Sequence, residues 1–280
     1  EDILAQGTAD ITVVNPPPTG GTSNMLIFSI NPPNQAPMLN PVGPFSVGEG
    51  GTLQLEASGS DPDGDSIQYA WDLDNDGTFE TAGQSVAFSA TALDGPGSQA
   101  IAVQITDSLG LSDSSPAVVE MLNVNPTATF ATPDANINEW ESASLAFSET
   151  NDPGAADTAA GFTYSYDCTG DGWEVENTTA LFYNCLYADN GVYTVTLSVT
   201  DDEGAATTDT LTVTVTNVAP TLNAGADQAA SEGQTVSLAP ATFHDLGTGD
   251  THTATISWGD ETATEAGVVE ETPFGPPGST

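Results

Sequence analysis

A segment of about 91 residues recurs along this chain, and this repeat constrains the fold more than any other feature of the sequence. Each copy opens at a proline, places a glutamate before a short apolar run, and then enters an Asp-rich turn. The recurring glutamates are Glu49, Glu141 and Glu232. The sequence therefore predicts a tandem array of domains of this size.

Short alternating segments rich in Val, Thr and aromatic residues fill each repeat. Examples are "TLQLEAS" (52–58), "FTYSYDC" (162–168) and "DTLTVTVTN" (209–217), and Asp, Gly, Asn and Pro separate them. Alternation with a period of two between turn residues predicts half-buried strands, and several such strands per repeat predict a β-sandwich. No segment has the helical period, so we expect an all-β fold.

Three aromatic–aspartate turns and one late strand resemble the polycystic kidney disease (PKD) domain family. The turns are "YAWDLDNDG" (69–77), "YSYDCTGDG" (164–172) and "ISWGDET" (256–262), and the strand is "GVYTVTLSVTDDEG" (191–204). The resemblance implies tandem PKD-like, immunoglobulin-like sandwiches of bacterial or archaeal surface proteins, or accessory modules of secreted hydrolases, without catalytic residues. Repeat one departs from the pattern, since "QAIAVQITDSLG" (99–110) lacks the tyrosine that Tyr193 provides in repeat two.

The repeat divides the chain into four expected parts. Residues 1–33 form an N-terminal extension with two spare strands, 34–125 the first sandwich, 126–219 the second, and 220–280 a truncated third. The third repeat stops before the position at which repeat two adds its last two strands. A sandwich without those strands exposes core surface and unpaired edges, which invites strand addition from another chain.

The two alternating runs of the extension are candidate donor strands. They are "GTADITVVNPPP" (7–18), which resembles the last strand of repeat two, and "NMLIFSINPP" (24–33). We expect their Pro and Gly breaks to keep them apart and each to enter the third domain of a neighbouring copy. Head-to-tail donation would build a homopolymeric filament. The alternative, a third domain that continues past Thr280 in a longer protein, stays open. The side chains expected to be buried by donation are Ile11, Val13, Leu26, Phe28 and Ile30.

The charge of the chain restricts its partners. The sequence has 40 Asp and Glu residues, two His, and no Lys or Arg, for a formal charge of −40. Its carboxylates must therefore be solvated, protonated or neutralised by cations, and calcium is the natural cofactor. Electrostatic binding to nucleic acid or anionic membranes is excluded, and no apolar run approaches the roughly 18 residues needed for membrane insertion.

Alternating aspartates in repeat one are the strongest candidate calcium ligands. "DLDNDG" (72–77) places three carboxylates around one turn, as in the first half of an EF-hand loop, although Gly83 stands where that loop has its bidentate glutamate. The alternative is that Asp and Gly simply make good turns. The absence of basic residues favours calcium. The candidate ligands are Asp72, Asp74, Asp76, Asp61, Asp63 and Asp65, with weaker sets at Asp152, Asp157, Asp167 and Asp171 and at Asp245, Asp250 and Asp260.

The remaining motifs favour an extracellular structural role. Cys168 and Cys185 are predicted to form a disulfide, and Asn177 begins a glycosylation sequon. His244 and His252 lack the further ligands that zinc needs, and no nucleophile motif occurs, so no enzyme is predicted. Matching strand positions predict core roles for three aromatic residues, whereas Trp140 and Trp173 are expected to be exposed. The three core aromatics are Trp71, Tyr166 and Trp258.

These observations predict a structural subunit of an extracellular filament or surface array, assembled head to tail and stabilised by calcium. The alternative is an adhesion or spacer segment of a giant surface protein, or an accessory module of a secreted hydrolase. Glycans and other surface proteins are further candidate partners.

Overall fold

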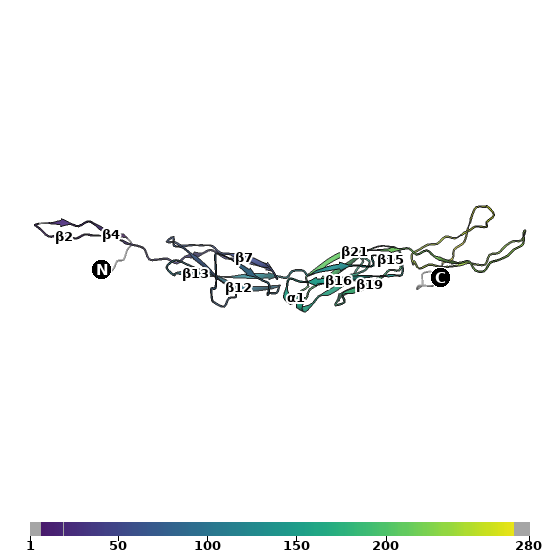
Figure 1. Cartoon of the computed structure of the whole chain (residues 1–280), viewed down its shortest axis with the longest axis horizontal. Helices are drawn as coiled ribbons and strands as arrows, with labels where there is room; N and C mark the ends of the chain where they lie inside the picture. The colour runs from purple at the N-terminus through teal and green to yellow at the C-terminus, as the bar shows by residue number, and fades with distance from the viewer. Residues whose placement is uncertain (1–6, 19, 272–280) are drawn as a thin grey trace. The chain divides into compact units, whose positions relative to one another are not determined.

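The computed structural model describes residues 7–18 and 20–271, apart from the side chains of Ala9 and Phe28. The chain divides into two compact units (Figure 1): the first spans residues 1–90 and 95–122, and the second residues 91–94 and 123–280. The fold is all-β and immunoglobulin-like. Among the described residues the one α-helix is α1 (Ala155–Ala160), which is too short to cross a bilayer.

The first unit contains a sandwich built from repeat one. Its larger sheet has the strand order β10-β9-β12-β13-β6, β11 pairs with β7, and β5 pairs with β8. Alternate residues of β12 are buried, as the sequence pattern predicts: Ile101, Val103 and Ile105 have no exposed surface. The strands are β5 (Met38–Leu39), β6 (Phe45–Gly48), β7 (Thr52–Glu56), β8 (Gly59–Ser60), β9 (Gln68–Asp72), β10 (Thr81–Ala82), β11 (Ser85–Ser89), β12 (Gly97–Thr106) and β13 (Ser112–Leu122).

The second unit begins with a sandwich built from repeat two. Its sheets have the orders β15-β21-β20-β17-β18 and β14-β16-β19, and side chains from both form one core. Phe147 of β16 lies with its ring centre 4.7 Å from Tyr164 and 5.4 Å from Tyr166 of β17, so aromatic contacts join the two sheets. The strands are β14 (Thr127–Ala131), β15 (Asn136–Asn138), β16 (Ser142–Asn151), β17 (Thr163–Asp167), β18 (Val175–Thr178), β19 (Phe182–Leu186), β20 (Gly191–Thr200) and β21 (Ala206–Thr216).

The structure shifts the equivalence of the two repeats by two residues. β6 runs parallel to the end of β13, and β15 runs parallel to the end of β21. The residue after each of these strands is a buried glutamate, Glu49 and Glu139 respectively, whose backbone N–H donates to the last strand of its repeat. The counterpart of Glu49 is therefore Glu139. Glu141, which the sequence comparison used, is exposed.

The two N-terminal runs pair with each other, so the expectation that their Pro and Gly breaks keep them apart is wrong. β1 (Gly7–Ile11) is antiparallel to β4 (Leu26–Ile30), and β2 (Val14–Asn15) to β3 (Gly21–Thr22). The first break, "NPPPTGGTSN", instead reverses the chain, and pairing then satisfies the backbone N–H and C=O groups that face the partner run, while the outer edges of the hairpin stay unpaired. Val13 lies between β1 and β2 and donates its backbone N–H to Ser23 Oγ at 2.9 Å. The side chain of Phe28 lies outside the described residues.

The described residues of the segment after repeat two form only two short two-stranded sheets. β22 (Thr221–Asn223) pairs with β23 (Thr242–His244), and β24 (Thr255–Ile256) pairs with β25 (Glu265–Ala266). Several apolar side chains remain exposed because, up to residue 271, no second sheet covers these pairs. They are Leu222, Val236, Leu238, Trp258 and Val268.

The core predictions for the aromatic side chains are confirmed in the two sandwiches but not in the segment after repeat two. Trp71 and Tyr166 are fully buried and lie in the cores of the first and second sandwiches, as predicted. The prediction for Trp258 is wrong, since this side chain follows β24 by two residues and is 46% exposed. Trp173 is 39% exposed, as expected. Trp140 is half-buried, because its indole N–H donates to the backbone oxygen of Leu246.

Candidate cation-binding sites

The turn after β9 brings its carboxylates together. Side-chain oxygens of Asp72, Asp74, Asp76 and Glu80 lie within 4.8 Å of one another. Sequence reasoning missed Glu80, although it occupies the ninth position counted from Asp72, which is a ligand position in EF-hand loops. The group offers only oxygen ligands, the kind that calcium prefers.

Part of this carboxylate group also shapes the turn. Asp72 accepts hydrogen bonds from the backbone N–H groups of Asp76 and Gly77, at 3.2 and 2.8 Å, and Asp76 accepts one from Thr78 at 2.7 Å. Asp72 is buried, whereas Asp74, Asp76 and Glu80 are exposed. The hydrogen bonds to Asp72 and Asp76 therefore hold the turn in shape without an ion. The carboxylates of Asp74, Asp76 and Glu80 are exposed to solvent, where an ion could reach them.

The upstream aspartates do not complete this group. Asp61 and Asp65 lie within 4.8 Å of Asp107, which follows β12. Asp63 instead accepts hydrogen bonds from the backbone and side-chain nitrogens of Gln35, at 2.7 and 3.1 Å. Five of the six candidate ligands of repeat one thus divide between the turn after β9 and the group around Asp107, while Asp63 anchors the segment that enters the sandwich.

Asp107 is a structural residue that sequence reasoning missed. Its carboxylate accepts hydrogen bonds from the Asn34 side chain at 2.8 Å and from the backbone N–H groups of Leu109 and Leu111, both at 2.9 Å. Burial acts to raise the pKa of Asp107, but these hydrogen bonds outweigh it and place the pKa below its ordinary value. Asp201 has the equivalent role in repeat two, since it accepts from Gly204 and Ala205 in the turn after β20.

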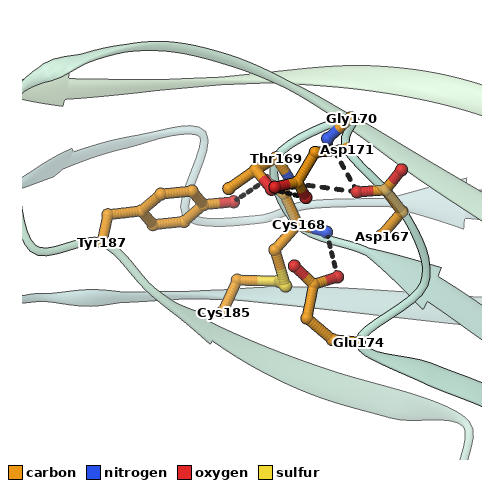
Figure 2. The surroundings of a disulfide bond; sticks show 8 residues. All are labelled: Asp167, Cys168, Thr169, Gly170, Asp171, Glu174, Cys185 and Tyr187. Atoms are coloured by element: carbon orange, nitrogen blue, oxygen red, sulfur yellow. Dashed lines mark hydrogen bonds between the residues drawn. A yellow bond between two sulfur atoms is a disulfide. The ribbon is translucent and has the colours of Figure 1, made fainter.

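The weaker aspartates of repeat two also separate. Asp152 and Asp157 group with Asp201 and are buried. Asp167 and Asp171 belong to another turn, after β17, shown in Figure 2. There Asp167 accepts backbone hydrogen bonds from Thr169 and Gly170, at 3.1 and 2.7 Å, while Asp171 accepts one from the Thr169 hydroxyl.

A disulfide lies beside this turn and joins the two sheets of the second sandwich (Figure 2). It links Cys168, which follows β17, to Cys185 in β19, with the two Cα atoms 5.7 Å apart. Glu174 accepts a hydrogen bond from the Cys168 backbone N–H at 2.7 Å, and the Tyr187 hydroxyl donates to the Cys168 carbonyl at 3.0 Å. Burial raises the pKa of Tyr187 to about 12, so its hydroxyl stays protonated and can donate at neutral pH.

The other candidate residues lie apart from these groups. Asn177 is exposed in β18, so its side chain is accessible to modification. His252 pairs with Asp245 at 2.6 Å and with Glu271 at 3.1 Å. Hydrogen bonding to Asp245 is the main cause that raises the pKa of His252, which makes this histidine the basic partner of two carboxylates in a chain without Lys or Arg.

Comparison with known proteins identifies the two sandwiches as separate modules. Residues 34–120 match the family model described as "Bacterial Ig domain", and residues 123–215 match the one described as "PKD domain". The resemblance of repeat two to the PKD domain family is thereby confirmed. Repeat one matches a different immunoglobulin-type family, in agreement with its missing tyrosine.

One curated relative and two solved structures illustrate these similarities. Chitinase A of Pseudoalteromonas piscicida is 29% identical over 130 residues, which cover 44% of this chain and only 16% of the relative's length. The PKD1 domain of the Vibrio cholerae metalloprotease PrtV is 25% identical, covers 33% of this chain and 98% of that domain, and has a TM-score of 0.25. The PKD1 domain of Vibrio anguillarum Epp is 26% identical, with coverages of 33% and 94% and a TM-score of 0.24.

Proposed function

Because residues 34–120 form a bacterial immunoglobulin-type domain and residues 123–215 a PKD domain, we propose that this chain is a non-catalytic spacer and attachment segment of an extracellular protein. The observation that carries the proposal is the pair of complete sandwiches of module types that are typically non-catalytic. A disulfide that bridges the sheets of the second sandwich suits an oxidising compartment. The exposed sequon at Asn177 is compatible with the same location.

A polysaccharide is the proposed target of attachment. The curated relative is named a chitinase, and the second sandwich presents Trp173 with 39% of its surface exposed. An exposed indole offers a flat apolar face with a polar edge, which suits stacking on a sugar ring.

We expect insoluble chitin to retain the purified chain, and Trp173→Ala to weaken retention at least about tenfold because aromatic anchors dominate binding energies. Pull-down isotherms measure this effect. Phe182→Ala is the matched control, since Phe182 is also an exposed aromatic residue of the second sandwich, and it should bind like the wild type. Equal binding by Trp173→Ala and the wild type would exclude this surface, and hydrolysis of chitin by the chain would refute a non-catalytic role.

A second candidate function is self-assembly by strand donation. The hairpin of residues 7–30 exposes Ile11, Val13 and Leu26, and the segment after repeat two exposes Leu222 and Val268. The hairpin is antiparallel, as are β20 and β21, the last two strands of repeat two. We propose that the hairpin of one copy covers the thin third segment of the next copy, which would join main-chain hydrogen bonding to apolar burial and generate a head-to-tail filament.

Calcium is the proposed cofactor at the turn after β9. Asp74→Asn combined with Asp76→Asn should remove the calcium-dependent stabilisation of the first sandwich, since both carboxylates are exposed members of that group. Saturating calcium at about 100 times Kd is expected to stabilise the wild type by about 2.7 kcal/mol. Thermal unfolding with calcium and with chelator measures the difference. Asp134→Asn, which changes an exposed carboxylate of repeat two, should leave it intact. If calcium raises the Tm of the first sandwich equally in the double variant, the ligands lie elsewhere.

A further inference from the structure

Three acidic side chains from well-separated stretches of the second unit converge at one place. Glu139 follows β15, Asp189 lies between β19 and β20, and Asp250 lies between β23 and β24. Each contributes a carboxylate oxygen, and these oxygens lie within 4.8 Å of one another. Two of the residues belong to the second sandwich and one to the segment that follows it.

Hydrogen bonds hold the two parts together around this group. Thr248 donates its backbone N–H to the Ala188 carbonyl at 3.3 Å, and the Trp140 indole donates to the Leu246 carbonyl. The backbone N–H of Val218 donates to Glu139 Oε1 at 2.8 Å. The loop of residues 246–250 is therefore attached to the residues that flank Glu139 and Asp189.

The second carboxylate oxygen of Glu139 is buried without a partner, which indicates that a bound ion belongs beside it. Glu139 is only 1% exposed, and its Oε2 is buried without a hydrogen-bond partner, as is Oδ2 of Asp250. Both oxygens face the same small space, because a Cβ atom added to Gly247 would lie 2.8 Å from Glu139 Oε2 and 2.5 Å from Asp250 Oδ2. A Cβ atom on Gly249 would collide with Asp189 Oδ2. The two glycines allow the loop backbone to approach the carboxylates this closely.

When its carboxylates are ionised, a group of this kind is unfavourable unless a positive charge joins it. Leaving a buried carboxylate unpaired costs several kcal/mol, and the chain has no Lys or Arg to pair with it. His252 forms its ion pairs with Asp245 and Glu271, not with these three residues. Burial raises the pKa of Glu139 and of Asp250, and the neighbouring carboxylates of Asp245 and Asp189 raise both further.

We propose that Glu139, Asp189 and Asp250 bind one calcium ion that fastens the loop of residues 246–250 to the second sandwich. Calcium fits the chemistry because the site offers only oxygen ligands, and the ion accepts six to eight of them in flexible geometry, with water completing the shell. Magnesium demands a near-ideal octahedron and dehydrates reluctantly, so three carboxylates fixed by different segments suit it less well. This site is separate from the turn after β9, and the proposal holds whether the chain is a spacer or a filament subunit.

Amide hydrogen exchange on the full chain tests the proposal, with calcium alone as the probe. The Thr248 amide reports attachment of the loop, since it donates to Ala188. Calcium at about 100 times Kd should slow local opening by about 100-fold in the wild type. Glu139→Gln should lose this response. Asp250→Asn provides a second variant if Glu139→Gln does not fold, and Asp227→Asn, an exposed carboxylate of the same segment, is the matched control.

The variants also separate a calcium site from a purely structural cluster. In chelator, Glu139→Gln should exchange more slowly at Thr248 than the wild type, because one of the repelling charges is gone. In calcium the order should reverse. A calcium response that is equal in the wild type and in both variants, or no response at all, overturns the proposal. Stronger protection by magnesium than by calcium would assign the site to magnesium.

Discussion

Deletion of residues 1–33 is expected to abolish self-assembly while both sandwiches remain folded. The deleted segment contains the hairpin with its exposed apolar face, and none of its described residues belongs to the buried core of either sandwich. A two-stranded hairpin is marginal in water and gains most when its open face is covered. Light scattering and electron microscopy of the full chain and the deletion variant measure assembly, and circular dichroism measures folding.

Point variants on the hairpin make this test specific. Ile11 and Leu26 are directly opposite in the ladder, so their side chains lie on one face. Ile11→Asp combined with Leu26→Asp should prevent assembly, because donation would bury two charges without partners. Ile27→Asp is the control: Ile27 is opposite Asp10 and belongs to the other face. Filaments formed by the deletion variant would exclude donation, and a full chain that stays monomeric would favour the spacer function.

Local alternation was enough to predict the sandwiches. In β20 the pattern assigns Val195, Leu197 and Val199 to the core, and all three are fully buried. This success is physical, because a period of two fixes which side chains share a face once one face is covered. The same rule failed for Trp258, since its burial depends on a covering sheet that the described residues do not contain.

The candidate sites were less predictable because they depend on contacts between distant segments. Asp72, Asp74 and Asp76 lie in one turn, so spacing alone brings them together. Glu139 and Asp250 approach each other only after the loop near Gly247 attaches to the second sandwich. Their signal in the sequence is indirect: a glutamate recurs near the start of each complete repeat, and two glycines, Gly247 and Gly249, precede the distant aspartate.

Trp71→Ala is expected to remove about 3–5 kcal/mol from the free energy of unfolding of the first sandwich, the range typical for truncating a buried aromatic residue. Trp71 has no exposed surface, its ring centre lies 6.4 Å from that of Phe45, and its indole N–H donates to the Gly83 carbonyl at 3.0 Å. Because a domain is stable by only about 5–15 kcal/mol, this loss is a large part of the total.

Three further variants separate the loss of the buried ring from the loss of its hydrogen bond and from effects outside the first sandwich. Trp71→Phe keeps an aromatic ring but loses the hydrogen bond to Gly83, so it should cost less than Trp71→Ala. Trp173→Ala changes an exposed tryptophan and should alter stability by less than about 0.5 kcal/mol. Tyr166→Ala should destabilise the second sandwich instead, since Tyr166 is its fully buried counterpart. Urea unfolding, monitored by circular dichroism, should therefore show one early transition for each core variant. In Trp71→Ala the first sandwich should unfold early, and in Tyr166→Ala the second. A loss below about 1 kcal/mol for Trp71→Ala would mean that the core of repeat one is organised around other residues.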